Sequence, residues 1–285
     1  TQLAPDIVEA VAFSRDGTLF AAGCNNGQVL LGKGDGSELV PVFEMGPKQK
    51  EGDEAPAPLV QTEKMVQSIA FVENDTLLIA ATLRGEISVW DLAAGQLLAE
   101  PLQTSSFRVA FHPDDPLVLT DQRRPRAIFW NCRTGKRRGA LKVPDADDLD
   151  VTVDAVAWPK AGTAVTVSSD HRVLFWDVST RAPMGHALQL PGEAIGAGTL
   201  SFGGERFIAC AYLEKQAWIR HFAPAQLTIG DGQSRPAAFV ELGANGELLY
   251  VLNGNELSVL SSEGKAEQTI NVGERVDSGP ILSRN

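Results

Sequence analysis

The chain has 285 residues, 44% of them hydrophobic, which is enough to bury a large core, and its 27 glycines suit tight turns better than long helices. The formal net charge of −11 disfavours a nucleic-acid partner, because proteins that bind phosphate backbones usually carry a basic surface. The sequence has no run of about 18 apolar residues and no signal-peptide pattern at its N-terminus, so we expect no membrane partner. Cys24, Cys132 and Cys210 are far apart, and we expect free thiols in a reducing cytoplasm.

A pattern recurs along the chain at a spacing of about 40 residues: an apolar strand, a turn, a second apolar strand and a third strand that ends in or near Trp. The first strands close on aromatic residues, which are Phe13, Phe71, Phe111, Trp158, Phe202 and Phe239. The third strands end at Gly32, Trp90, Trp130, Trp176, Phe222 and Leu260. Self-similarity of this kind, with four short strands per unit, is typical of β-propeller blades.

The repeats predict an all-β fold made of one β-propeller domain over residues 1–285. Six four-stranded units are expected at about 8–43, 64–102, 105–143, 153–190, 195–229 and 234–272, and the first strand of a seventh at 276–285. Since the seventh unit stops after one strand, we expect the sequence to be a piece of a longer chain, with Val276 to Ser283 on the edge of an unfinished blade. A mobile excursion is predicted from Glu44, and a compact acidic loop from Val143.

Three of the third strands end in a related motif: WDLAAGQ from Trp90, WNCRTGK from Trp130 and WDVSTRA from Trp176. These segments resemble the WD40 repeat family, whose third strand ends in Trp-Asp before a tight turn, and the outer strands are similar to those of bacterial WD40 arrays, which often follow signalling modules. The resemblance covers nearly the whole chain, and it implies a WD40-like propeller. It also implies a structural network of a second-strand Ser or Thr, a turn Asp and the third-strand Trp, which Ser168, Asp170 and Trp176 match.

Motifs for catalysis are missing from the sequence. There is no Gly-x-Ser-x-Gly segment, no phosphate-binding loop and no cluster of Cys and His with metal-ligand spacing. We therefore predict no enzymatic activity and no cofactor or metal. An alternative is an enzyme with a catalytic or metal site at the propeller channel, which would require inward polar side chains where the first strands offer mainly Ala, Ser, Gly and Glu.

One face of the predicted propeller should carry a charged cluster. In the WD40 family, the turns between second and third strands share a face with the connections between units, and partners usually dock there. The residues expected on this face are Arg84, Arg123, Arg124, Arg126, His171 and Arg172, with Asp145, Asp147, Asp148 and Asp150 in the acidic loop. These groups could simply pair with each other, and exposed pairs contribute only about 0–1 kcal/mol.

The alternative for these groups is a recognition patch for a charged segment, in which Arg side chains offer paired contacts to carboxylates. For the protein as a whole we expect a non-catalytic scaffold or sensor propeller that presents a rigid face to a protein or peptide, or to another domain of its own chain. The opposite face, formed by turns such as SRDG from Ser14 and HPDDP from His112, should be acidic or neutral.

Overall fold

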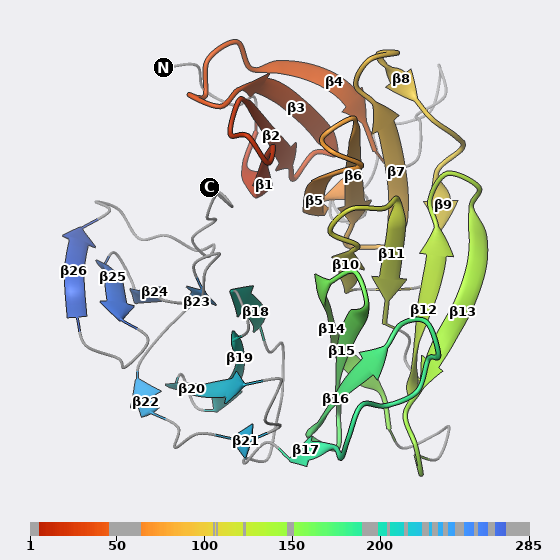
Figure 1. Ribbon diagram of the computed structural model, residues 1–285. Coiled ribbons are helices and arrows are strands. Elements are labelled where there is room, and N and C mark those ends of the chain that lie inside the picture. The colour runs from red at the N-terminus through yellow and green to blue at the C-terminus, as the bar shows by residue number, and fades with distance from the viewer. Residues whose placement is uncertain are drawn as a thin grey trace, which may run out of the picture. The chain divides into compact units, whose positions relative to one another are not determined.

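The computed structural model describes residues 6–45, 64–104, 106, 108–121, 124–146 and 151–189, and it continues mainly as strands between residues 199 and 271. Within this part of the chain, the strands form six antiparallel sheets (Figure 1). The predicted excursion lies largely outside the described residues, and so does the segment from Val276 to Ser283. No helix in the described part is long and apolar enough to cross a membrane.

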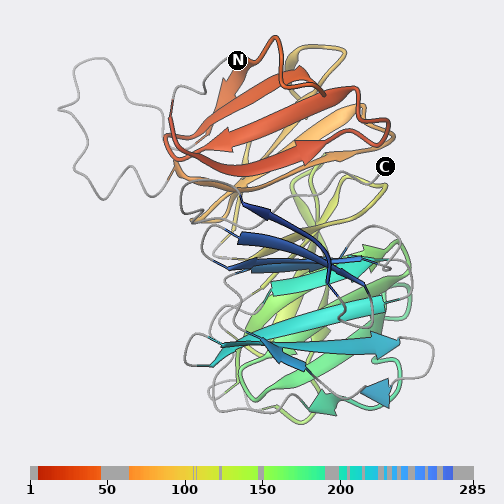
Figure 2. The same ribbon diagram turned by 90° about the vertical axis from the view of Figure 1, so that its left-hand side faces the viewer.

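The first three sheets follow the chain in order, each with its first strand at one edge. The first sheet contains β1 (Val8–Phe13), β2 (Leu19–Cys24), β3 (Gln28–Lys33) and β4 (Val40–Glu44), and Figure 2 shows it broadside. The second contains β5 (Val66–Val72), β6 (Leu77–Thr82), β7 (Glu86–Asp91) and β8 (Gln96–Leu97), with β9 (Leu102–Gln103) also paired to β7. The third contains β10 (Val109–Phe111), β11 (Leu117–Thr120), β12 (Arg126–Asn131) and β13 (Lys136–Lys142).

The last three sheets repeat this order. The fourth contains β14 (Val153–Lys160), β15 (Thr163–Ser168), β16 (Arg172–Asp177) and β17 (Leu188–Gln189). The fifth contains β18 (Thr199–Gly203), β19 (Arg206–Leu213), β20 (Gln216–Ala223) and β21 (Thr228–Ile229), with β22 (Gln233–Arg235) also paired to β20. The sixth contains β23 (Phe239–Leu242), β24 (Leu248–Asn253), β25 (Glu256–Ser261) and β26 (Ala266–Asn271). The predicted all-β fold of repeated four-stranded units is confirmed.

The strand register places the three tryptophans at equivalent positions. Each is the fifth residue of a six-residue third strand, and each pairs with the second residue of the preceding strand. The pairs are Trp90 with Leu78, Trp130 with Val118 and Trp176 with Ala164.

The register expected for the sixth unit is wrong by three residues. Phe239 begins β23 instead of closing it, and Leu242 takes the place that Phe13 has in the first sheet: Leu242 pairs with Leu249 as Phe13 pairs with Phe20. The physical reason is that apolar alternation continues past Phe239 through Val240 and Leu242, so the ladder extends beyond the aromatic residue.

The chain divides into two compact units. One comprises residues within Thr1–Gln122 and Ile128–Ala140, and the other residues within Arg123–Ala127 and Leu141–Arg284. Strands β12 and β13 of the third sheet therefore have residues in both.

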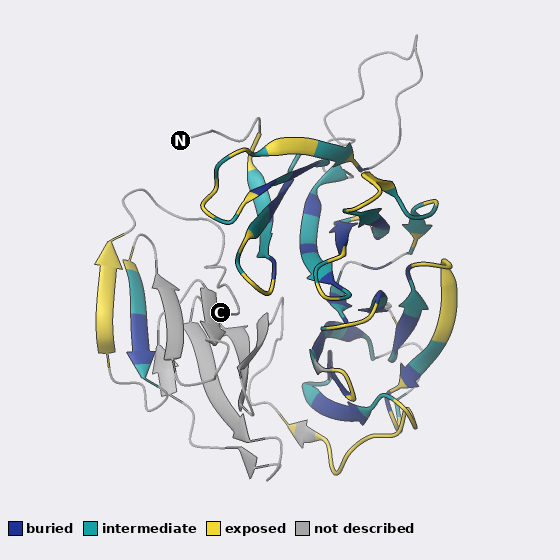
Figure 3. Cartoon of the chain, turned by 45° about the horizontal axis from the view of Figure 1, so that its top comes forward, coloured by how far each residue is buried: buried dark blue, intermediate teal, exposed yellow. Residues whose placement is uncertain are grey.

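The core of the first unit lies between its sheets. One cluster joins Val29 of the first sheet to Ile69 and Leu78 of the second, and a further cluster joins the second sheet to Val118 of the third. All six residues of β6 are buried, because an inner strand covered on both faces has no solvent side (Figure 3). The sequence LLIAAT of this strand has the continuous apolar run that such a position requires.

Candidate docking face

The turn between β15 and β16 is organised by the carboxylate of Asp170. It accepts hydrogen bonds from the hydroxyl of Ser168 and from Nε of Arg172, the latter at 2.6 Å. Arg172 also donates through Nη1 to the carbonyl of Pro144 at 2.8 Å. The guanidinium group therefore links its own turn to the connection between β13 and β14.

The pKa of Asp170 lies below its ordinary value. Partial burial on its own would raise this pKa, but the hydrogen bonds from Arg172 and Ser168 and the positive charge of Arg172 outweigh it. The carboxylate therefore stays ionised, and it keeps Arg172 oriented over the neighbouring connection.

His171 stands at the tip of this turn in the left-handed region, with φ of 68°. The corresponding residues in the first two sheets are Gly27 and Gly85, and in all three turns the backbone N–H at this position donates to the carbonyl three residues earlier. A Cβ on Gly27 or Gly85 would approach a neighbouring carbonyl to within 2.6 Å. A side chain other than that of Gly costs about 1–2 kcal/mol in this conformation, so the imidazole is held at the surface against local preference.

Backbone hydrogen bonds connect three segments of the second unit: the turn before β12, the connection between β13 and β14, and the turn between β15 and β16. The carbonyls of Arg124 and Pro125, which precede β12, accept from the N–H groups of Val153 and Val143. On the other side of the same connection, Thr152 and Ser169 exchange two hydrogen bonds, at 2.8 and 3.0 Å. We call this arrangement the turn cluster, which comprises residues 124–126, 143–145, 152–153 and 169–172.

The turn cluster contains five of the predicted site residues: Arg124, Arg126, Asp145, His171 and Arg172. Arg124 and Asp145 are exposed, and the other three are half-buried. The guanidinium of Arg124 forms no hydrogen bond or ion pair with the residues that the structure describes.

Of the other residues predicted on the docking face, one lies in another turn and the rest lie outside the described residues. Arg84 is exposed in the turn between β6 and β7, within the first unit. Outside the described residues lie Arg123, Asp147, Asp148 and Asp150.

The expected structural network is divided in two. Trp176 donates from Nε1 to the hydroxyl of Thr166 at 2.9 Å, whereas Ser168 binds Asp170. The reason is register: Thr166 shares its side of the sheet with Ala164, which pairs with Trp176, while Ser168 lies at the strand end beside the turn. Of the expected network, Ser168 and Asp170 are therefore in contact, whereas Trp176 donates to Thr166 instead of joining them.

The equivalent tryptophans differ in their partners. Trp130 donates to Thr120 at 3.0 Å, whereas Trp90 stacks on Phe43 with the ring centroids 5.1 Å apart. Trp176 is only 1% exposed, and the other two are half-buried.

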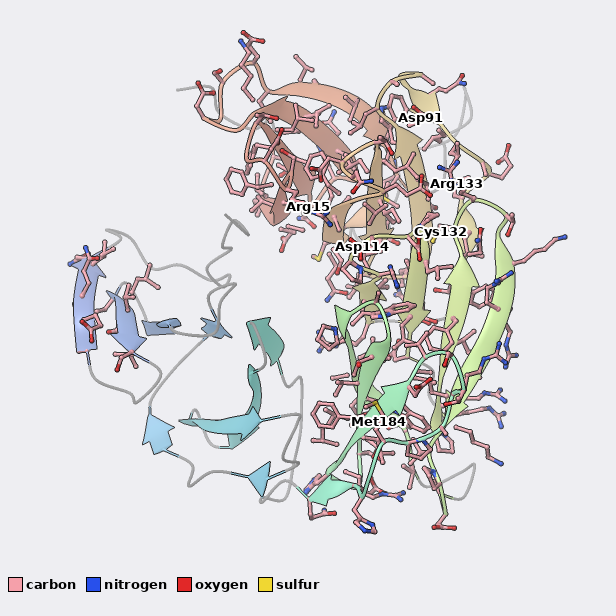
Figure 4. The ribbon with its side chains drawn as sticks, viewed as in Figure 1. Arg15, Asp91, Asp114, Cys132, Arg133 and Met184 are labelled. Atoms are coloured by element: carbon pink, nitrogen blue, oxygen red, sulfur yellow. The ribbon has the colours of Figure 1, made fainter. Side chains whose placement is uncertain are left out.

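In the first unit, the turns between first and second strands and the turn between β12 and β13 carry charges of both signs. Arg15 donates to Asp114 at 2.7 Å (Figure 4), and its backbone N–H donates to Asp75. Arg133 binds Glu73 through two nitrogens, and this bond raises the pKa of Arg133. Sequence reasoning missed these pairs, because their members are about 60 to 99 positions apart and no local pattern joins them.

The described residues include no group of three His, Cys, Asp or Glu side chains arranged to hold a metal. Residues 4–31 match the family model of the WD domain, G-beta repeat. This stretch is therefore similar to a WD40 repeat. It covers β1, β2 and most of β3, although its third strand ends in Leu-Gly-Lys without a Trp. Among curated proteins, no sequence matches the chain significantly.

Proposed function

We propose that the protein is a non-catalytic interaction scaffold whose turn cluster binds an acidic segment of a partner protein or of another domain of its own chain. The observation that carries the proposal is the network of Asp170, Arg172 and Pro144, which joins turns from two places in the sequence. WD40 repeats in general mediate protein–protein interactions as scaffolds, and this supports the class of function.

The charge of the turn cluster favours an acidic partner. Asp170 is occupied by Arg172 within the cluster, whereas the exposed Arg124 has no counterion among the described residues. A guanidinium group offers two parallel N–H donors to a carboxylate, which gives direction as well as charge. On a protein of net charge −11, such a local reversal of sign steers acidic partners.

The proposal can be tested with a labelled peptide of alternating Asp and Gly. This peptide supplies carboxylates but has little tendency to form a strand, so it probes the turn cluster rather than a sheet edge. Fluorescence anisotropy at low salt should show binding, and Arg124→Glu should weaken it about tenfold or more, which corresponds to about 1.4 kcal/mol.

Two controls separate recognition from folding. Arg137→Glu makes the same change of charge outside the turn cluster and should leave the affinity for this peptide within about twofold. Circular dichroism and thermal unfolding should show that both variants remain as stable as the parent. If Arg124→Glu binds the peptide as tightly as the parent does, the turn cluster is not the docking face.

A further inference from the structure

The positive charge of the chain is concentrated in one segment. Between Asp121 and Asp145 the sequence contains eight basic residues and no acidic one. The chain has 25 basic and 36 acidic residues, so the remaining 17 basic residues leave a formal charge of −19 outside this segment. The segment forms strands β12 and β13 and the turns beside them.

Much of this charge lies at the surface of β13. The six residues from Arg133 to Arg138 are all exposed (Figure 3). Four of them are basic. Arg133 is bound to Glu73. Lys136 and Arg137 form no ion pair with the described residues, so their charges face solvent.

β13 is also an edge. It is the last strand of its sheet in the order β10-β11-β12-β13, and the described residues place no strand on its outer side. At seven residues it is longer than the outer strands β4 and β26, which have five and six residues, respectively. Those two strands carry acidic rather than basic residues, Glu44 and Glu267. Only β13 thus combines a long outer edge with positive charge among these three.

We propose that β13 is a second interaction surface, which takes an acidic peptide segment of a partner protein as an added strand along its outer edge. An extended peptide added to a sheet edge gains main-chain hydrogen bonds, and its alternate side chains reach the flanking residues. Here the flanking residues are Lys136, Arg137 and Arg138, so carboxylates on the peptide meet charge of the opposite sign. This site differs in place and in binding mode from the turn cluster.

The side chains also limit what else the edge can accept. Positive charge along an edge strand opposes pairing with the same strand of another copy, because two basic strands repel. An acidic strand is attracted to the same edge. The distribution of charge therefore selects between partners that offer identical backbone hydrogen bonds.

The test uses a labelled peptide of alternating Glu and Val, which has both the charge and the strand propensity that the edge requires. Anisotropy should show binding that weakens with added salt and falls at least tenfold in Lys136→Glu/Arg137→Glu. Arg124→Glu should bind it like the parent, so failure here is distinguishable from failure of the turn cluster. The same peptide N-methylated at alternate residues keeps its charge but cannot complete the hydrogen bonds, and it should bind at least tenfold more weakly.

Hydrogen exchange gives an independent reading. Addition of the unmodified peptide should slow exchange of backbone amides within residues 136–140, and the N-methylated peptide should not. Equal binding of the two peptides would overturn the added strand, and an unchanged affinity of the double Glu variant would overturn the site.

Two further outcomes would also overturn the proposal. A single-stranded oligonucleotide that binds more tightly than the peptide and is lost in the same variant would make β13 a nucleic-acid surface. If the parent does not bind the peptide and light scattering shows that Lys136→Thr/Arg137→Thr dimerises, the charges serve only to prevent two copies of the chain from pairing.

Discussion

Replacing Thr166 by Val removes the acceptor of the indole N–H of Trp176 and changes little else. The two side chains are each about 1% exposed, and the hydrogen bond between them is 2.9 Å long. Val keeps the branched shape and the strand preference of Thr, so the sheet should form as before. Water cannot easily replace the lost hydroxyl at a site this closed, and an unpaired buried donor costs about 1–3 kcal/mol. We therefore expect Thr166→Val to lower the free energy of unfolding by that amount.

Urea denaturation followed by tryptophan fluorescence would measure this loss as a shift in midpoint. Thr166→Ser is the matched control, because it keeps the acceptor and removes one methyl group, for a cost of about 1 kcal/mol. Thr120→Val makes the same change at Trp130, whose indole donates to the fully buried Thr120 at 3.0 Å, and it should also be destabilising. A Thr166→Val protein as stable as the parent would show that the hydrogen bond to Trp176 contributes nothing.

Three other expectations follow from the charges and thiols. Because the pKa of Asp170 is lowered by folding, its stabilisation is present above the unfolded value of 3.8 and is lost as the pH falls below it; acid unfolding of Asp170→Asn should therefore be less steep. A double-mutant cycle on Glu73 and Arg133 should give a coupling below about 1 kcal/mol that shrinks in 1 M salt, and a larger, salt-independent value would contradict a surface pair. Burial raises the pKa of the Cys132 thiol to about 12, so Cys132 and the fully buried Cys24 should react with Ellman's reagent only after unfolding, whereas rapid reaction in the native state would refute their burial.

The repeat was predictable because the same local sequence pattern recurs in each sheet. Three strands with apolar runs and short turns recur in every unit, and Trp90, Trp130 and Trp176 fix the register of three of them. Where the aromatic marker was followed by more strand, as at Phe239, the same rule placed the first strand three residues too early.

The candidate site was less predictable, because side-chain pairing depends on register and on distant contacts. The family pattern placed Ser168 and Trp176 in one network, but Thr166 lies nearer than Ser168 to Ala164, the pairing partner of Trp176, and it is Thr166 that accepts from the indole. The bond from Arg172 to Pro144 spans 28 positions, and nothing in the local sequence announces it. The basic strand β13 was visible in the sequence, but its exposure and its place at the sheet edge required the structure.

Two sheets whose second strands are buried throughout, β6 and β15, differ in the turn that follows. The turn after β6 has Arg84 and Gly85 where the turn after β15 has Asp170 and His171, although both close with the same backbone hydrogen bond. The glycine can pack against a neighbouring carbonyl at a distance that a Cβ cannot, whereas His171 trades that close packing for an imidazole at the surface. An inner strand has little freedom to vary, since both faces must be filled. The turns and edges that depart from the conformation favoured by packing are therefore the places in each sheet at which to look for a binding function.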